Sequence, residues 1–268
     1  MNKLFFILFF LIFFTSSCTS RKVIDYESGK GFSHVDITGE YFISDPKFLG
    51  NKKIKSFSQA KKIIKDHDYF GIKEEIYCGC EFKRGRISEN AACGLQARKN
   101  RDRAYRIEFE HIVPFENQVG HTAAWLNGAK ECGDKHGRKC ASKVFAHMEA
   151  DLWNLWPAAG ELNADRSNYS FTELTGSRDQ YGKCDFKVED RKVAPRQSVK
   201  ALIAYTYMYF QKTYAPYLKT NYISGKNEKL FDAWTKLPLT KEQCRWAQEV
   251  SELQENQNED LLKACHLK

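Results

Sequence analysis

The spacing of apolar residues predicts a chain built mainly of helices. Ser56 and Gln59 have the spacing of a capping box, and the apolar residues Ala60, Ile63 and Ile64 then share one helical face. We therefore expect a first helix from residue 57. Helical spacing recurs over residues 143–152, 161–168 and 199–210, and after the capping pair Thr240 and Gln243.

Two segments instead alternate between apolar and polar residues, as strands with one buried face do. They are residues 76–78 and residues 105–111, and the second segment ends at His111. The run Pro157-Ala158-Ala159-Gly160 is expected to break the chain before the helix over residues 161–168. Together these elements predict an α+β fold, a single mainly helical domain with a small antiparallel sheet.

The first residues carry a different pattern, a basic start followed by an unbroken apolar run over residues 4–14. This run is shorter than the roughly 20 apolar residues of a membrane helix and matches the apolar core of an export signal, about 7–15 residues. We therefore interpret residues 1–17 as a signal peptide; a retained anchor helix is the weaker alternative. Cys18 is a candidate for lipid attachment, although Thr15 stands where such signals usually carry Leu.

The residues after the leader divide into two parts. Residues 18–54 are polar, contain several glycines and show no sustained apolar period, so we expect a linker or arm. The folded domain is then expected to span residues 55–268. No second apolar stretch like the leader follows, so we expect no membrane span. We also expect a monomer that is exported to the periplasm or secreted.

The cysteines indicate an oxidising compartment. Apart from Cys18 they form an even set scattered over the domain, which favours disulfides as staples of the fold. We expect Cys132 to pair with Cys140 and Cys244 with Cys265, because each pair closes a short local loop. Zinc is the alternative, but the nearest approach to a zinc spacing, residues 78–80 (CGC), does not fit.

The charge balance suggests a polyanionic partner. The formal net charge is +8, of which Lys3 in the leader contributes one. A basic exported protein is suited to nucleic acid or to an anionic membrane surface. Two runs of basic residues could supply the contacts, although ordinary solvated surface is an equally open interpretation of the second: Arg98, Lys99, Arg101, Arg103 and Arg106, then Lys183, Lys187, Arg191, Lys192 and Arg196.

Residues 108–114 (EFEHIVP) place an acid beside an imidazole. Neighbouring strand residues face opposite ways, so Glu110 and His111 can serve one site only if the strand ends or bulges here, as the proline allows. An imidazole ordinarily titrates near neutral pH, so His111 is suited to take a proton from water. Glu110 and Asn163 offer hard oxygen ligands that suit Mg²⁺, and Arg138 can bind phosphate oxygens through its guanidinium.

These residue types match the needs of phosphodiester hydrolysis, which are a base, a cation and a phosphate donor. Taken one by one, each residue also has an ordinary structural interpretation. His111 can be a merely buried or exposed histidine, Asn163 a helix cap and Arg138 a solvated surface charge. The residues alone leave both interpretations open.

Several longer motifs resemble the bacterial endonuclease I family of periplasmic and secreted non-specific nucleases. Residues 97–114 (ARKNRDRAYRIEFEHIVP) resemble its signature, and the resemblance covers roughly residues 55–265. The further motifs follow in the family's order: YCGC at 77–80, MEADLWNL at 148–155, GELNADRSN at 160–168 and AYTYM at 204–208. Phe109 and Ile112 depart from the family, which often carries Trp and Val there.

The resemblance implies a ββα-metal active site, in which a strand carries a histidine base and a following helix an asparagine ligand. His111 is then the general base, while Glu110 and Asn163 hold one Mg²⁺, for which Mn²⁺ or Ca²⁺ can substitute in binding. Arg138 matches the family's phosphate-binding arginine. Glu149 matches an acidic residue that supports the site indirectly. Two further residues, Asp151 and Asn154, are expected to be structural.

The implied function is an exported, Mg²⁺-dependent endonuclease that cuts DNA without sequence preference and leaves 5′-phosphate ends; RNA stays open as a second substrate. Binding through phosphates should then be strongly salt-sensitive. The alternative from another class is a non-catalytic exported nucleic-acid-binding protein, which needs no His-Glu-Asn site. The cysteines add the hypothesis that the reduced protein is inactive and so harmless to its own genome.

Overall fold

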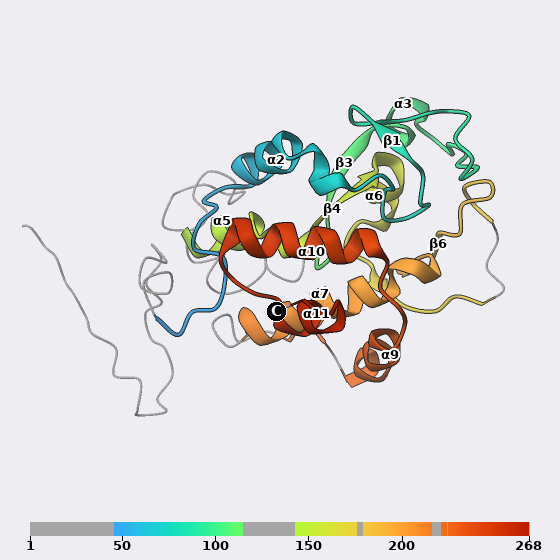
Figure 1. Cartoon of the computed structure of the whole chain (residues 1–268). Helices are drawn as coiled ribbons and strands as arrows, with labels where there is room; N and C mark the ends of the chain where they lie inside the picture. The colour runs from blue at the N-terminus through green and yellow to red at the C-terminus, as the bar shows by residue number, and fades with distance from the viewer. Residues whose placement is uncertain (1–45, 115–142, 176–178, 216–220, 224, 268) are drawn as a thin grey trace, which may run out of the picture. The chain divides into compact units, whose positions relative to one another are not determined.

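The computed structural model describes residues 46–114, 143–175, 179–215, 221–223 and 225–267. Over these ranges the chain is α+β, as predicted, with several helices and small sheets (Figure 1). No helix in them combines the length and the apolar character that crossing a membrane requires. The predicted leader and Cys18 lie outside the described residues.

The elements follow one another along the chain as follows. The helices are α2 (Phe57–Asp66), α3 (Arg101–Ala104), α5 (Lys143–Glu149), α6 (Gly160–Arg166), α7 (Lys200–Thr213), α9 (Gly225–Thr235), α10 (Lys241–Gln254) and α11 (Glu259–Ala264), with short 3-10 turns η1 (Asp68–Gly71), η3 (Leu152–Asn154) and η4 (Gln197–Val199). The strands are β1 (Phe82–Lys83), β2 (Arg86–Ile87), β3 (Ile107–His111), β4 (Leu155–Ala159), β5 (Ser170–Phe171), β6 (Lys187–Glu189) and β7 (Lys192–Ala194).

The predicted helices are confirmed, and their caps explain where they begin. Ser56 accepts a hydrogen bond from the backbone of Gln59 at the start of α2. The Gln59 side chain reaches back to the backbone of Lys55 at 3.0 Å. Thr240 and Gln243 form a complete capping box at the start of α10. The prediction for residues 161–168 is met by α6, which begins one residue earlier.

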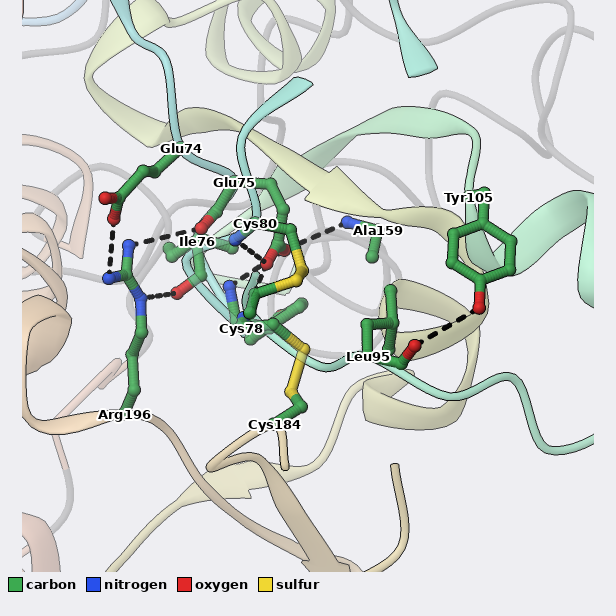
Figure 2. Close-up of a disulfide and its surroundings, with 12 residues drawn as sticks. Glu74, Glu75, Ile76, Cys78, Cys80, Leu95, Tyr105, Ala159, Cys184 and Arg196 are labelled. Atoms are coloured by element: carbon green, nitrogen blue, oxygen red, sulfur yellow. Dashed lines mark hydrogen bonds and ion pairs between the residues drawn. A yellow bond between two sulfur atoms is a disulfide. The ribbon is translucent and has the colours of Figure 1, made fainter. Parts of the chain in front are cut away.

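The strand expected at residues 76–78 is wrong, because these residues form a turn. The reason is Glu75, which is fully buried. Its carboxylate accepts hydrogen bonds from the backbone N–H groups of Tyr77 (3.0 Å), Cys78 (2.5 Å) and Cys80 (3.3 Å), which curls the chain around it (Figure 2). A fourth N–H, that of Ala159, donates to the same carboxylate at 3.1 Å.

The break expected at residues 157–160 is also wrong, because the first three of them belong to strand β4. β4 pairs antiparallel with β3, and Pro157 lies opposite Phe109. Proline is compatible with this strand because its nitrogen, which has no hydrogen to donate, faces away from the ladder. The outer edge is covered instead by the Glu75 turn, where Ile76 N–H donates to Pro157 O at 2.9 Å.

The small antiparallel sheet is confirmed in part. β1 pairs with β2 and β3 with β4, both antiparallel. A three-stranded sheet has the order β5-β7-β6, and in it β5 runs parallel to β7 while β6 runs antiparallel. The parallel pair was not predicted, since two-residue strands carry no readable alternation.

The core lies between β4 and the long C-terminal helices. Every residue of β4 is buried. Trp246 of α10 packs edge-on against Trp153 and Trp156 at centroid distances of 5.4 and 4.9 Å. α7 is buried on most of its circumference, including Leu202 and Phe210. The strand that pairs with β3 is therefore set in a rigid aromatic framework.

The described end of the expected arm, residues 46–54, differs from a linker. Phe48, Asn51 and Ile54 are buried. The Asn51 side chain donates to the backbone oxygens of Ile54 and His147, each at 2.7 Å, and Asn51 N–H donates to Tyr214 at 3.0 Å. These buried polar contacts make the segment part of the domain, because an unpaired backbone group there would be costly.

Three disulfides lie among the described residues: Cys78–Cys184, Cys80–Cys93 and Cys244–Cys265. The last pair confirms the prediction, and Cys132 and Cys140 lie outside the described residues. One cluster of described residues, Glu75 with Cys78 and Cys80, has the spacing of a metal site. It does not fit zinc, because both sulfurs are in disulfides and the carboxylate is occupied by backbone N–H groups.

The hydrogen bonds of Glu75 predict how Glu75→Gln changes the stability of the protein. Glu75→Gln exchanges an acceptor oxygen for an NH₂ group that faces N–H donors, so we expect a loss of about 2 to 4 kcal/mol in the free energy of unfolding. Urea unfolding of the oxidised protein measures it. Glu81→Gln, at an exposed position of the same region, serves as the control; equal stability of the two variants would contradict this account.

Candidate active site

β3, β4 and α6 form one continuous unit at the centre of the candidate site. α6 begins directly at the end of β4, where the Gly160 N–H donates to Arg106 O at 2.9 Å. A side chain at Gly160 would meet Arg103 O and Glu108 Oε1, both 2.8 Å from the position of a Cβ. Only glycine therefore lets α6 pass this close to β3.

Glu110, one of the predicted metal ligands, is buried under α6. Its Oε1 accepts hydrogen bonds from Tyr77 and from Arg166 Nη1, each at 2.5 Å. Arg166, which is 1% exposed, also donates to the backbone oxygens of His111 (2.8 Å) and Ile112 (2.6 Å). Burial opposes the positive charge, but the Glu110 carboxylate outweighs it and raises the pKa of Arg166.

Asn163 lies one helical turn before Arg166 on the same helix. Its Nδ2 donates to Glu108 Oε2 at 3.2 Å. Arg103 and Arg106 also bind Glu108, at distances from 2.8 to 2.9 Å. Burial alone would raise the pKa of Glu108, yet these guanidinium groups lower it below its usual value.

Glu108 was not among the predicted site residues. The alternation of β3 predicts the face on which it lies. Residues two apart on a strand share a face, so Glu108 lies on the same side as Glu110. Neither Glu110 Oε2 nor Asn163 Oδ1 accepts a hydrogen bond from any described residue. Both oxygens have the chemistry of a hard-cation ligand, which fits a divalent ion better than a soft one.

His111 lies at the last position of β3, on the opposite face from Glu110. Its ring packs against Phe57 of α2 at a centroid distance of 4.8 Å. Its Nε2 is 2.9 Å from the backbone oxygen of Glu149. A carbonyl oxygen only accepts, so Nε2 carries the hydrogen and Nδ1 holds the lone pair of the neutral ring.

The imidazole is kept neutral by its surroundings. Burial, together with the positive charges of Arg166 and Lys61, lowers the pKa of His111 to about 4, against the hydrogen bond to Glu149 O. A neutral imidazole with a fixed tautomer can accept a proton at neutral pH. The predicted strand end at this residue is confirmed, since β3 stops at His111.

Three other residues singled out from the sequence, Glu149, Asn154 and Arg138, differ in where the structure places them. Glu149 reaches the site through its backbone oxygen, while burial raises the pKa of its carboxyl group. Asn154 clamps the chain after β3, because its side chain accepts from Val113 N–H at 2.7 Å and donates to Val113 O at 3.0 Å. Arg138 lies outside the described residues.

Asp151 is structural, as expected. It is fully buried and caps η3 by accepting from Trp153 N–H at 3.0 Å. Two tyrosine hydroxyls, of Tyr209 and Tyr214, donate to its other oxygen at 2.7 and 2.5 Å. The carboxylate thereby joins the start of β4 to α7.

The first basic run is largely neutralised by carboxylates. Arg98 and Lys99 pair with Asp165, Arg101 with Glu89, and both Arg103 and Arg106 with Glu108. In the second run Arg196 pairs with Glu74. The remaining members, Lys183, Lys187, Arg191 and Lys192, form no ion pair with a described residue. The sequence runs are therefore poor guides to where free positive charge lies.

Comparisons with known proteins match this chain to one family. A family model described as Endonuclease I matches residues 45–263. Endonuclease-1 of Buchnera aphidicola subsp. Acyrthosiphon pisum (strain APS) is 38% identical over 85% of this chain and 90% of its own length. An extracellular and a periplasmic deoxyribonuclease of Aeromonas hydrophila are each 37% identical over 71% of this chain, and over 82% and 78% of their own lengths.

The match runs through the described core, including β3, β4 and α6. It begins at residue 45, in agreement with the buried segment 46–54. The family implies a metal-dependent nuclease that acts on nucleic acid. The chain belongs to the endonuclease I family and is a nuclease.

Proposed function

We propose that this nuclease is an exported, Mg²⁺-dependent endonuclease that hydrolyses DNA without sequence preference, with RNA left open as a second substrate. One observation carries the proposal, the neutral His111 held by Glu149 O at the end of β3, next to Glu110. Relatives named extracellular and periplasmic deoxyribonuclease support export and DNA as substrate. Residues 1–17 are the export signal in this proposal, and the enzyme is a monomer.

His111 is the general base. With Nε2–H donated to Glu149 O, Nδ1 takes the proton from the attacking water. The lowered pKa keeps the ring unprotonated at neutral pH, so no fraction of the enzyme is lost to the imidazolium form. The role of Glu149 is then to orient the base through its backbone, and its carboxyl group supports the site indirectly.

Glu110 and Asn163 are the metal ligands, through Glu110 Oε2 and Asn163 Oδ1. A bound Mg²⁺ would neutralise charge on the scissile phosphate and on the leaving oxygen. The residues fit this role because Glu110 is anchored by Arg166 and Tyr77 through its other oxygen, and Asn163 by Glu108 through its amide nitrogen. β3, β4 and α6 would then be the ββα-metal motif.

Substrate binding rests on phosphate contacts. In this proposal Arg138 forks onto phosphate oxygens. Among the described residues, the unpaired members of the second basic run, Lys183 to Lys192, are further candidates. Contacts to phosphates position a strand without reading its bases, so the binding is salt-sensitive and independent of sequence.

Replacing His111 tests the base. Loss of a general base costs about 10²–10⁴-fold in rate, so His111→Ala should lower plasmid cleavage by that factor while leaving DNA binding nearly intact. His67→Ala removes an exposed histidine from the end of α2 and is the control. Undiminished cutting by His111→Ala would rule out the mechanism.

Removing the metal tests the ligands. A chelator should abolish cleavage and added Mg²⁺ should restore it. Asn163→Ala should raise the Mg²⁺ concentration needed for half-maximal activity by about tenfold or more, because one oxygen ligand is lost. Asn168→Ala, beyond the end of α6, is the matched control. Activity of Asn163→Ala at the wild-type Mg²⁺ requirement would exclude Asn163 as a ligand.

Reduction tests the link between disulfides and activity. Cys78–Cys184 and Cys80–Cys93 hold the Glu75 turn, which covers the outer edge of β4. We expect the fully reduced protein to lose most of its cleavage rate and to regain it on reoxidation. Thiol titration confirms the redox state. Equal digestion of plasmid by reduced and oxidised protein would contradict this expectation.

A further inference from the structure

α2 places a lysine beside the face of β3 that carries His111. The Phe57 ring packs on the His111 ring at 4.8 Å, and Lys61 Nζ lies 4.4 Å from the centroid of that same Phe57 ring. The two distances together limit how far the ammonium group can be from the imidazole. The ammonium group and the imidazole therefore both contact the Phe57 ring.

No carboxylate of a described residue forms an ion pair with Lys61. The residue is half-buried. A positive charge left unpaired beside the base is suited to an anion that arrives with the substrate.

Its neighbour on α2 behaves differently. Lys62 is exposed and pairs with Asp66 one turn later. Lys65 is also exposed and lies 5.9 Å from the centroid of the Phe109 ring. Within this helix Lys61 is therefore the lysine whose ammonium group lies over the ring that packs on His111.

We propose that Lys61 is a substrate-binding residue whose ammonium group contacts the phosphate next to the scissile bond. The proposal rests on the proposed function of His111. Lys61 lies outside both basic runs of the sequence, and it adds a contact on the α2 side of the strand end. The ammonium group itself lies over the Phe57 ring, 4.4 Å from its centroid, and this cation–π contact holds it in place before the substrate binds.

The experiment compares Lys61→Met with Lys62→Met, which removes the same charge from the adjacent position. Steady-state cleavage of a short DNA duplex is measured at fixed salt with Mg²⁺. Losing a charge-assisted hydrogen bond should lower kcat/KM of Lys61→Met about tenfold relative to Lys62→Met. The change should lie mainly in KM, because a phosphate beside the cut bond is bound equally in the ground state and the transition state.

The affinity for DNA under conditions without cleavage is a second, independent test of the Lys61 contact. Duplex binding is measured in a chelator over a series of salt concentrations. The slope of log affinity against log salt should fall by about 0.9 for Lys61→Met, as expected for one lost phosphate contact. Lys61→Arg should retain most of the affinity. Lys61→Ala is a second variant without the charge. The thermal unfolding midpoint of each variant shows whether the loss of the Phe57 contact has lowered stability, so that a binding defect can be told apart from it.

The proposal is overturned if Lys61→Met and Lys62→Met agree within about twofold in kcat/KM and share one salt slope. It is equally overturned if Lys61→Ala binds as the wild type does. Failure of the proposed function looks different, since His111→Ala would then keep cutting in the same assay. The binding comparison in chelator does not depend on that result.

Discussion

The buried guanidinium of Arg166 is the contact on which the candidate site depends. It joins three parts of the site, the Glu110 carboxylate and the backbone oxygens of His111 and Ile112, and packs 4.6 Å from the Phe171 ring. A buried charge is costly without a close partner. Glu110 is that partner, and both terminal nitrogens of Arg166 donate hydrogen bonds, whereas its Nε has no partner among the described residues. α6 therefore cannot move from β3 without exposing an uncompensated carboxylate, and the end of the strand is held at a fixed position.

This constraint explains how neighbouring residues on a regular strand can serve one site. Glu110 and His111 face opposite sides, and their functions can meet only where β3 stops. Arg166 fixes the carbonyl groups at that point from one side. Asn154 fixes the next residue, Val113, through both of its backbone groups. The strand end is thus rigid without any bulge, which is the geometry that a preorganised site requires.

The helices and β3 could be predicted because their signals are local, a cap or a spacing within a few residues. β4 could not, since its proline suggested a break and its strand identity depends on pairing with β3, far away in the chain. The turn after Glu75 has an apolar pattern typical of a strand, and only a buried carboxylate overrides it. The disulfides follow the same rule, that local contacts are predictable and distant ones are not. The local pair Cys244–Cys265 was predicted, whereas Cys78–Cys184, 106 residues apart, was not.

The same distinction applies to charge. Five basic residues before β3 suggest a phosphate-binding run, yet the fold places carboxylates against them. One of these is Glu108, which pairs with Arg103 and Arg106 and also accepts a hydrogen bond from Asn163 Nδ2. Those arginines therefore neutralise the carboxylate that binds Asn163, the proposed metal ligand. Positive charge without an ion-pair partner among the described residues comes instead from α2, at Lys61, near the proposed base His111. Net charge therefore indicates the class of partner, while the location of the contact is decided by which cations the fold leaves unpaired.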